Sequence, residues 1–178
     1  RSIDFDGVDD HLDAGNNIDL TGSFTISAWI NKDADNGSIV SKRNSGFTSG
    51  YDFSINSSGN LVMSWIAGGT NVITSSIAIP SDIWSHVAVT FNGTTAKLYI
   101  DGVEDTTAGA AATIISSPVS TGEDFRIARG SSGSYFDGNI DEVRIWNIAL
   151  TEDQLRFIMN QEIEENGEIL KVEGKILP

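Results

Sequence analysis

The sequence predicts an all-β fold of two packed antiparallel sheets, with one short helix near the C-terminus. Apolar and polar residues alternate in about a dozen short runs, and a period of two is typical of half-buried strands. Gly, Asn, Asp and Ser separate these runs, as they do at turns. Many short strands with turn signals between them indicate a two-sheet sandwich.

The clearest strands lie in the middle of the chain. In residues 24–30 every second side chain, from Phe24 to Ile30, is apolar and is expected to face the core. Asp101 and Gly102 stand between two alternating runs and form the strongest short signal for a hairpin. The same alternation predicts further core-facing positions at Val87, Val89, Phe91, Leu98, Ile100, Phe125, Ile127, Val143 and Ile145.

One helix is predicted after the last strand. Thr151 is the expected N-cap, and Gln154 three residues later completes a capping box. Leu150 and Leu155 are spaced as a hydrophobic staple, and Leu155 begins an apolar stripe along the helix that continues at Ile158. The helix is therefore expected to bury one face against the sandwich.

The chain is long enough for one domain with a sizeable core, because it has 178 residues. We expect this domain to span residues 1–160, and residues 161–178 to be an acidic linker or the start of a following domain. A final edge strand over residues 169–172 is the alternative for that tail. The sequence starts within a predicted strand, so we expect it to be a processed or excised part of a larger protein.

The composition excludes several classes of partner and metal site. Lys and Arg number 11 against 25 Asp and Glu, which gives a net charge of −14. Nucleic acids and anionic membranes need basic surfaces, and no apolar stretch approaches the roughly 20 residues that cross a bilayer, so neither partner is expected. Without Cys and with two His, the chain favours oxygen ligands and a hard cation such as Ca²⁺.

Five short strings occur in an order that resembles a known family. They are FDGVDD at 5–10, FTISAW at 24–29, WSHVA at 84–88, LYIDG at 98–102 and GNIDEVRIW at 138–146. Together they resemble the bacterial laminin-G-like and pentraxin-like domains of the concanavalin A-like lectin/glucanase superfamily. The resemblance implies a jelly roll of two antiparallel sheets, found as a module of secreted or cell-surface proteins that often bind glycans and often hold calcium.

A structural calcium site is the first functional expectation. Calcium takes 6 to 8 oxygen ligands, which acidic turns supply most easily, and residues 4–10 form such a turn. The resemblance implies an ion where the N-terminal turn meets the last long strand. Transferred to this sequence, that arrangement places Asp6 and Gly7 beside Asp141.

The position of Asp141 within its strand adds a second reason to expect a cation. Alternation places Asp141 on the same face as Val143 and Ile145, toward the interior, where an unpaired carboxylate is costly. A cation would satisfy this carboxylate. The alternatives are a backbone cap at the strand start or a salt bridge with an arginine, namely Arg126, Arg129 or Arg144.

A glycan site is the second expectation, because aromatic rings stack on sugars while nearby polar groups bind the hydroxyls. The candidate rings are Trp65, Tyr51, Tyr99 and Tyr135. Trp65 and Tyr51 share their parity with apolar neighbours, so core packing is the favoured alternative for both. Tyr99 faces away from its apolar neighbours, and Tyr135 ends a Gly- and Ser-rich stretch that is typical of a surface loop.

Catalysis is not expected, although the fold also occurs among glycoside hydrolases. A pair of catalytic carboxylates on one strand would be spaced as in Glu-x-Asp-x-Glu, and the sequence has no such string. Asp141 and Glu142 are adjacent and therefore point to opposite faces. Of the two histidines, His86 lies in a family string, where a structural hydrogen bond is the simpler role.

The sequence therefore predicts a non-catalytic carbohydrate-binding or adhesion module of a larger secreted or surface bacterial protein, with a structural calcium. Its expected partners are a polysaccharide or other glycan, or another surface protein, together with the neighbouring domains of its own chain. A protein–protein adhesion or spacer domain is one alternative. A glycan-cleaving enzyme of the same fold is the other.

Overall fold

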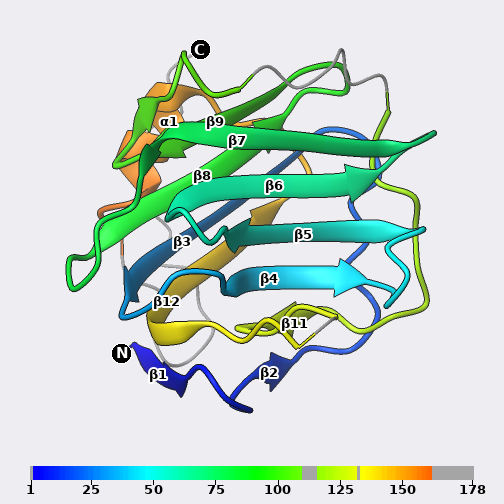
Figure 1. Ribbon diagram of the computed structural model, residues 1–178. Coiled ribbons are helices and arrows are strands. Elements are labelled where there is room, and N and C mark those ends of the chain that lie inside the picture. The colour runs from blue at the N-terminus through cyan, green and yellow to red at the C-terminus, as the bar shows by residue number, and fades with distance from the viewer. Residues whose placement is uncertain (1, 110–115, 132, 162–178) are drawn as a thin grey trace.

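The computed structural model describes residues 2–109, 116–131 and 133–161, which form two six-stranded antiparallel sheets packed face to face (Figure 1). The first sheet has the strand order β1-β12-β3-β8-β9-β10, and the second has the order β2-β11-β4-β5-β6-β7. The chain passes repeatedly between the two sheets, as in a jelly roll. The predicted all-β sandwich with one helix is confirmed. No helix in the described part of the chain is long and apolar enough to span a membrane.

The strands of the first sheet are β1 (Ile3–Asp6), β12 (Asp137–Trp146), β3 (Phe24–Lys32), β8 (Ser85–Phe91), β9 (Ala96–Ile100) and β10 (Val103–Glu104). Those of the second sheet are β2 (Leu12–Asp13), β11 (Arg126–Ile127), β4 (Ser38–Arg43), β5 (Gly50–Ile55), β6 (Asn60–Ile66) and β7 (Thr70–Ala78).

The core lies between the two sheets and follows the predicted alternation. In β3, every second side chain from Phe24 to Ile30 is fully buried. Phe53 of β5 faces the same interior from the second sheet. The rings of Trp65 and Phe91, one from each sheet, meet at 5.8 Å between centroids. Burial of such large rings is the main source of stability for a sandwich of this kind.

Helix α1 (Glu152–Ile158) covers part of the outer face of the first sheet. The predicted capping box is present: the Thr151 hydroxyl accepts the Gln154 N–H, and the Gln154 side chain accepts the Thr151 N–H. Leu155, the buried residue of the helix, packs into a small cluster with Leu150 on that outer face. The predicted linker, residues 161–178, lies outside the described residues apart from its first position.

The outer face of the second sheet faces the viewer in Figure 1, and the helix does not lie across it. The fold therefore covers part of the outer side of one sheet with α1, and the helix leaves the outer side of the other uncovered.

Candidate functional site

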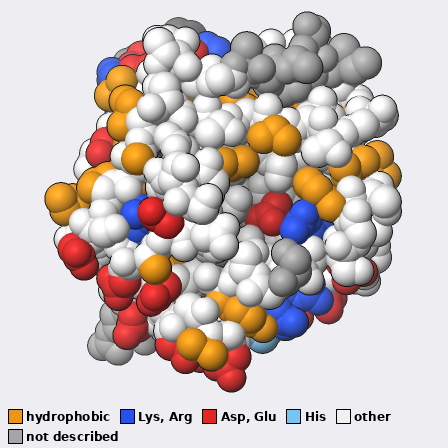
Figure 2. All heavy atoms as spheres, in the orientation of Figure 1, with side chains coloured by type: hydrophobic (Ala, Val, Ile, Leu, Met, Phe, Trp, Pro, Cys, Tyr) orange, Lys and Arg blue, Asp and Glu red, His pale blue; other side chains and the backbone are white. Residues whose placement is uncertain are grey.

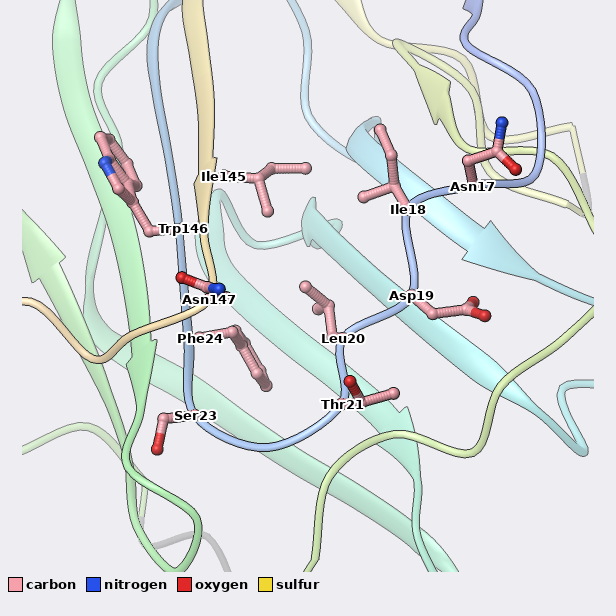
Figure 3. Close-up of a pocket in the computed structure, with 10 residues that line it drawn as sticks. All are labelled: Asn17, Ile18, Asp19, Leu20, Thr21, Ser23, Phe24, Ile145, Trp146 and Asn147. Atoms are coloured by element: carbon pink, nitrogen blue, oxygen red, sulfur yellow. The ribbon is translucent and has the colours of Figure 1, made fainter.

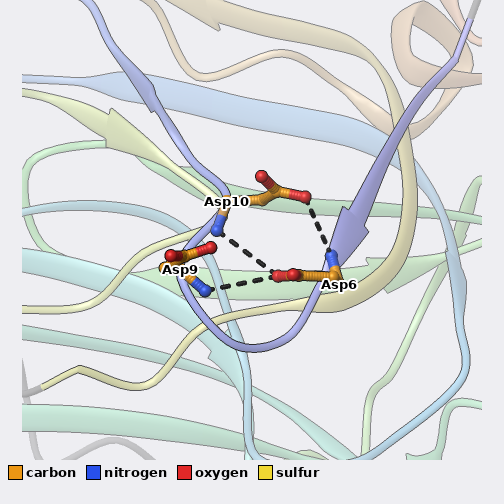
Figure 4. A group of neighbouring side chains, drawn as sticks. All are labelled: Asp6, Asp9 and Asp10. Atoms are coloured by element: carbon orange, nitrogen blue, oxygen red, sulfur yellow. Dashed lines mark hydrogen bonds between the residues drawn. The ribbon is translucent and has the colours of Figure 1, made fainter.

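The turn that follows β1 brings three aspartates together (Figure 4). Asp6, Asp9 and Asp10 are exposed, and each offers a carboxylate oxygen within 4.8 Å of the other two. One Asp6 oxygen accepts the backbone N–H groups of Val8 at 2.9 Å, Asp9 at 3.2 Å and Asp10 at 3.4 Å. These hydrogen bonds, that of Val8 first, hold the pKa of Asp6 below its usual range. The donor set is the hard, anionic type that suits Ca²⁺.

The acidic residue of β12 that lies beside this turn is Asp137. Asp6 pairs with Asp137 in the register between β1 and β12. A Cβ atom on Gly7 would lie 2.8 Å from the Asp137 Cβ, so the glycine backbone packs directly against this side chain. Asp141 lies four residues farther along the strand, about 13 Å away at the usual rise. This register corrects the predicted grouping of Asp6 and Gly7 with Asp141.

A β-bulge also places Asp141 on the outer face of the first sheet, and not toward the core. The register between β12 and β3 shifts directly after Asp141, where Glu142 has a φ of 52°. Asp141 pairs with Trp29, whose indole N–H bonds to the end of the helix outside the sheet. The extra residue resets the alternation, so Asp141 does not share a face with Val143 and Ile145. Its carboxylate accepts the Glu142 N–H at 2.8 Å.

Tyr51 and Trp65 are core residues, as the favoured alternative for them predicts. Their exposed fractions are 1% and 0%. The Tyr51 hydroxyl donates to the carbonyl of Ile18 at 3.0 Å, and the Trp65 indole N–H donates to the carbonyl of Ser116 at 3.3 Å. Burial also raises the pKa of Tyr51. Neither ring has a free face on which a sugar could stack.

Tyr99 points to the outer face of the first sheet, as predicted, but it is 3% exposed. It packs with Ala88, Leu150 and Leu155 in the cluster beneath the helix. The alternation of apolar and polar residues correctly predicts the direction of the Tyr99 side chain. It does not predict the burial, because the helix that covers Tyr99 lies some 50 residues later in the sequence. The ring is thus withdrawn from any ligand.

Tyr135 is the predicted ring residue that stays partly exposed. It contacts the His11 ring edge-on at 6.2 Å, and the Arg129 guanidinium lies 5.5 Å from its ring centroid. The His11 Nδ1 atom lies 2.9 Å from the carbonyl of Asp9, which can only accept a hydrogen bond. In the neutral ring Nε2 therefore accepts from Arg129, at 3.1 Å. Tyr135 belongs to a cluster that links its loop to the acidic turn.

The outer face of the second sheet holds a polar cluster that sequence reasoning missed. The Asp52 carboxylate accepts the Ser38 hydroxyl at 2.8 Å and lies 3.2 Å from the Arg43 Nε atom. Burial raises the pKa of Asp52, while the hydrogen bond from Ser38 and the charge of Arg43 act in the opposite direction. Asp52 lies in a row across the sheet that contains Asp13, Arg126, Ser41, Asp52, Ser64 and Val72.

Three arginines, Arg43, Arg126 and Arg129, form what we call the arginine patch. Arg43 and Arg126 are 15% and 18% exposed, and their positions are diagonal neighbours because Arg126 pairs with Ser41. Arg129 follows β11 and lies beside His11. Figure 2 shows basic side chains gathered over β4 and β11, with acidic side chains mainly along the left and lower rim. The patch joins segments more than 80 residues apart, so no local motif reveals it.

A separate pocket of about 480 Å³ lies between residues 17–23 and the adjoining ends of β3 and β12 (Figure 3). Its apolar side chains include Leu20, Phe24 and Ile145, and polar groups line its rim. Asp19, one of these polar groups, already binds the buried Lys42 ammonium at 2.8 Å. The hydrogen bond from Lys42 holds the pKa of Asp19 below its usual range. The pocket therefore offers apolar contact more than free charge.

A laminin G family model, described as the concanavalin A-like lectin/glucanases superfamily, matches residues 6–156. This match confirms the resemblance drawn from the five strings. No curated protein is significantly similar to the chain in sequence.

Several solved structures share the fold. A carbohydrate-binding module of a Ruminococcus gnavus sialidase, bound to α2,3-sialyllactose, is 15% identical with a TM-score of 0.66, over 89% of this chain and 97% of the module. A heptameric pentraxin from Limulus polyphemus is 19% identical with a TM-score of 0.66, over 88% of this chain and 80% of the pentraxin. Domain 4 of an extracellular arabinanase from Geobacillus stearothermophilus, in complex with arabinotriose, is 20% identical with a TM-score of 0.60, over 83% of this chain and 71% of the arabinanase domain.

Proposed function

The chain belongs to the concanavalin A-like lectin/glucanases superfamily, and from this premise we propose that it is a non-catalytic module that binds a glycan on the outer face of its second sheet. The observation that carries the proposal is the polar cluster of that face. The buried Asp52 holds the partly exposed Arg43 in a fixed position among further polar side chains, and the helix does not lie across this sheet. A guanidinium group that is fixed in this way can orient sugar hydroxyls.

Two of the similar structures support a glycan as the ligand. One is a carbohydrate-binding module with sialyllactose, and the other is an arabinanase domain with arabinotriose. Both share the fold of this chain at low identity, so they support the class of ligand and not its identity. The module would act in a secreted or surface protein, as part of a longer chain.

The spacing of Asp13 and Asp52 supports a binding role for this pair over hydrolysis. Asp13 and Asp52 lie in the same row but three strands apart, which corresponds to about 14 Å. Retaining glycosidases need about 5 to 5.5 Å between their carboxyl groups, and inverting enzymes about 6.5 to 9.5 Å. Between these two aspartates the row holds Arg126 and Ser41.

We also propose a structural calcium at the turn after β1. Asp6, Asp9 and Asp10 would hold the ion, with Asp137 as the neighbouring acidic residue of β12. A cation there would relieve the repulsion among these carboxylates and tie the start of the chain to its last strand. Asp141 has no part in this site because the register places it elsewhere.

Adhesion to a protein is the second candidate function, and an aliphatic strip favours it. Val62 and Ile66 of β6 and Val72 of β7 face outward on the second sheet, and Val72 is 44% exposed. Ile77 near the end of β7, an edge strand, is 60% exposed. Exposed apolar patches of this kind mark interaction surfaces.

A panel of immobilised neutral and acidic glycans tests the proposal. Wild-type protein should bind at least one member, and Asp52→Ala should weaken that binding about tenfold or more, because it removes the carboxylate that fixes Arg43 on this face. Lys97→Gln, a change at a 45% exposed position of β9 in the first sheet, should bind as the wild type does. Equal loss in both variants, or no binding by the folded wild-type protein, would contradict a glycan site here.

A further inference from the structure

The arginine patch stands out because the chain as a whole is strongly acidic, with a net charge of −14. Other basic side chains of the described residues have acidic or backbone partners elsewhere. Lys32 and Lys42 are buried and bind aspartates, while Arg144 binds Glu142 and the end of the helix. A cluster of cations on one open face is therefore not a consequence of the overall composition.

Arg43 is paired with Asp52, whereas carboxylates neutralise Arg126 and Arg129 incompletely. Arg126 lies 3.7 Å from Asp13 and 3.8 Å from Asp124, which is beyond hydrogen-bonding distance, and both aspartates are 44% exposed. Among the described residues, no carboxylate lies within 4 Å of Arg129, whose polar partner is the Nε2 atom of His11. Such long, exposed ion pairs are worth little and can be replaced by a better anion.

The side chains of the patch have the chemistry to bind a carboxylate. Guanidinium groups match a carboxylate with two parallel hydrogen bonds, and a partly buried arginine forms them more strongly than one in water. Arg43 and Arg126 are both partly buried, and Arg129 lies two residues beyond the end of β11. Beside Arg129, the half-buried Tyr135 ring offers an apolar surface for a sugar ring.

We infer that the arginine patch selects glycans that carry carboxylate groups, such as sialylated or uronic-acid chains. This inference rests on the proposed glycan-binding function and adds the class of sugar to it. Arg126 and Arg129 bind the carboxylates, and the buried Asp52 and Ser38 hold Arg43 in place beside them. The acidic side chains elsewhere on the surface do not prevent this contact, because physiological salt screens charges beyond about 8 Å.

Matched pairs of glycans test the inference by calorimetry. The pairs are polygalacturonate with its fully methyl-esterified form, and α2,3-sialyllactose with lactose. At least one acidic member should bind, and its neutral counterpart should bind about tenfold more weakly or not at all. Arg126→Gln and Arg129→Gln should each reduce the affinity for the acidic member by a similar factor. Lys97→Gln, which removes a cation from the first sheet, should leave it unchanged.

The Arg129→Lys variant separates charge from geometry, because lysine keeps the cation but lacks the planar fork. It should bind between the wild type and Arg129→Gln, with an unchanged thermal transition. Equal affinity for the acidic and neutral members of every pair that binds would overturn the inference and leave the glycan-binding function standing. Absence of binding to these pairs and to the whole glycan panel, by folded protein, would overturn both.

Discussion

Asp6 of β1 lies directly opposite Asp137 of β12, so two carboxylate-bearing residues meet where the chain enters the sandwich. Repulsion between such groups is unfavourable unless a cation or a set of N–H donors compensates it. Backbone N–H groups compensate Asp6, and Gly7 packs against the Asp137 side chain. This relationship identifies the residues on which a calcium site at the turn depends.

Calcium should therefore stabilise the wild-type protein. Millimolar Ca²⁺ should raise the melting temperature by several degrees after treatment with a chelator, since binding to the folded state adds stability by mass action. Asp6→Asn and Asp9→Asn should remove this increase, whereas Asp141→Asn should retain it because Asp141 lies elsewhere in the register. A transition that does not move with calcium would reject the site, and a response lost only in Asp141→Asn would reject this ligand set.

The pH dependence of stability should include a contribution from His86. Burial, with the charge of Arg144, lowers the pKa of His86 to about 4 from an ordinary value near 6.5. The unfolded chain therefore binds a proton between these values while the folded chain does not. The contribution of His86 to the free energy of unfolding is fully present above pH 6.5. It is lost as the pH falls toward 4, and the loss is about 3 kcal/mol at most.

Urea unfolding of the wild type and His86→Gln at several pH values measures this contribution. Carboxylates titrate in both proteins, so the difference between the two curves isolates the histidine. The stability of the wild type should fall more steeply between pH 6.5 and 4 than that of the variant. Parallel curves would show that His86 keeps its ordinary proton affinity in the folded protein.

Packing of α1 against the first sheet should depend on Leu155 far more than on Phe157. Leu155→Ala should cost about 2 to 5 kcal/mol of unfolding free energy, because the side chain is fully buried against Leu150 and Tyr99. Phe157→Ala is the matched control, since Phe157 is 56% exposed on the same helix, and it should change stability by less than about 0.5 kcal/mol. Similar losses in the two variants would contradict the observed packing.

Two glycines should differ in their tolerance of alanine for a steric reason. Gly50 and Gly68 both have positive φ, at 88° and 71°. A Cβ atom at Gly50 would lie 2.0 Å from the carbonyl oxygen of Lys42, whereas one at Gly68 meets no atom within 4 Å. Gly68→Ala should cost about 1 kcal/mol from the backbone conformation alone, and Gly50→Ala clearly more. Chemical denaturation of both variants gives the comparison, and equal costs would mean that the close approach is absent.

Local patterns predicted the sandwich and the helix because their signals lie within a few residues. Alternation from Phe24 to Ile30 identifies a strand and its buried face, and Thr151 with Gln154 marks the helix start without reference to any distant segment. Turn residues such as Asp101 and Gly102 act through their own backbone preferences. These features need no knowledge of which strands pair.

The candidate sites were harder to predict, because they depend on pairing and on interruptions of the pattern. The bulge at Glu142 breaks the alternation of β12, but the residues around it follow a regular apolar–polar pattern. This pattern predicts the wrong face of the sheet for Asp141. The partner of Asp6 depends on the register of β12, and the cover over Tyr99 depends on where the helix packs. The arginine patch exists only once β11 pairs with β4.

The location of the glycan is the most direct test of a binding site on the second sheet. Backbone amide NMR signals should be followed while a glycan that binds is titrated into the wild-type protein. We predict that the changes gather in β4, β5 and β11, including Ser41 and Asp52, while Ala88 and Tyr99 beneath the helix stay constant. Changes confined to the first sheet, or to residues 17–23 of the pocket, would contradict the proposed site.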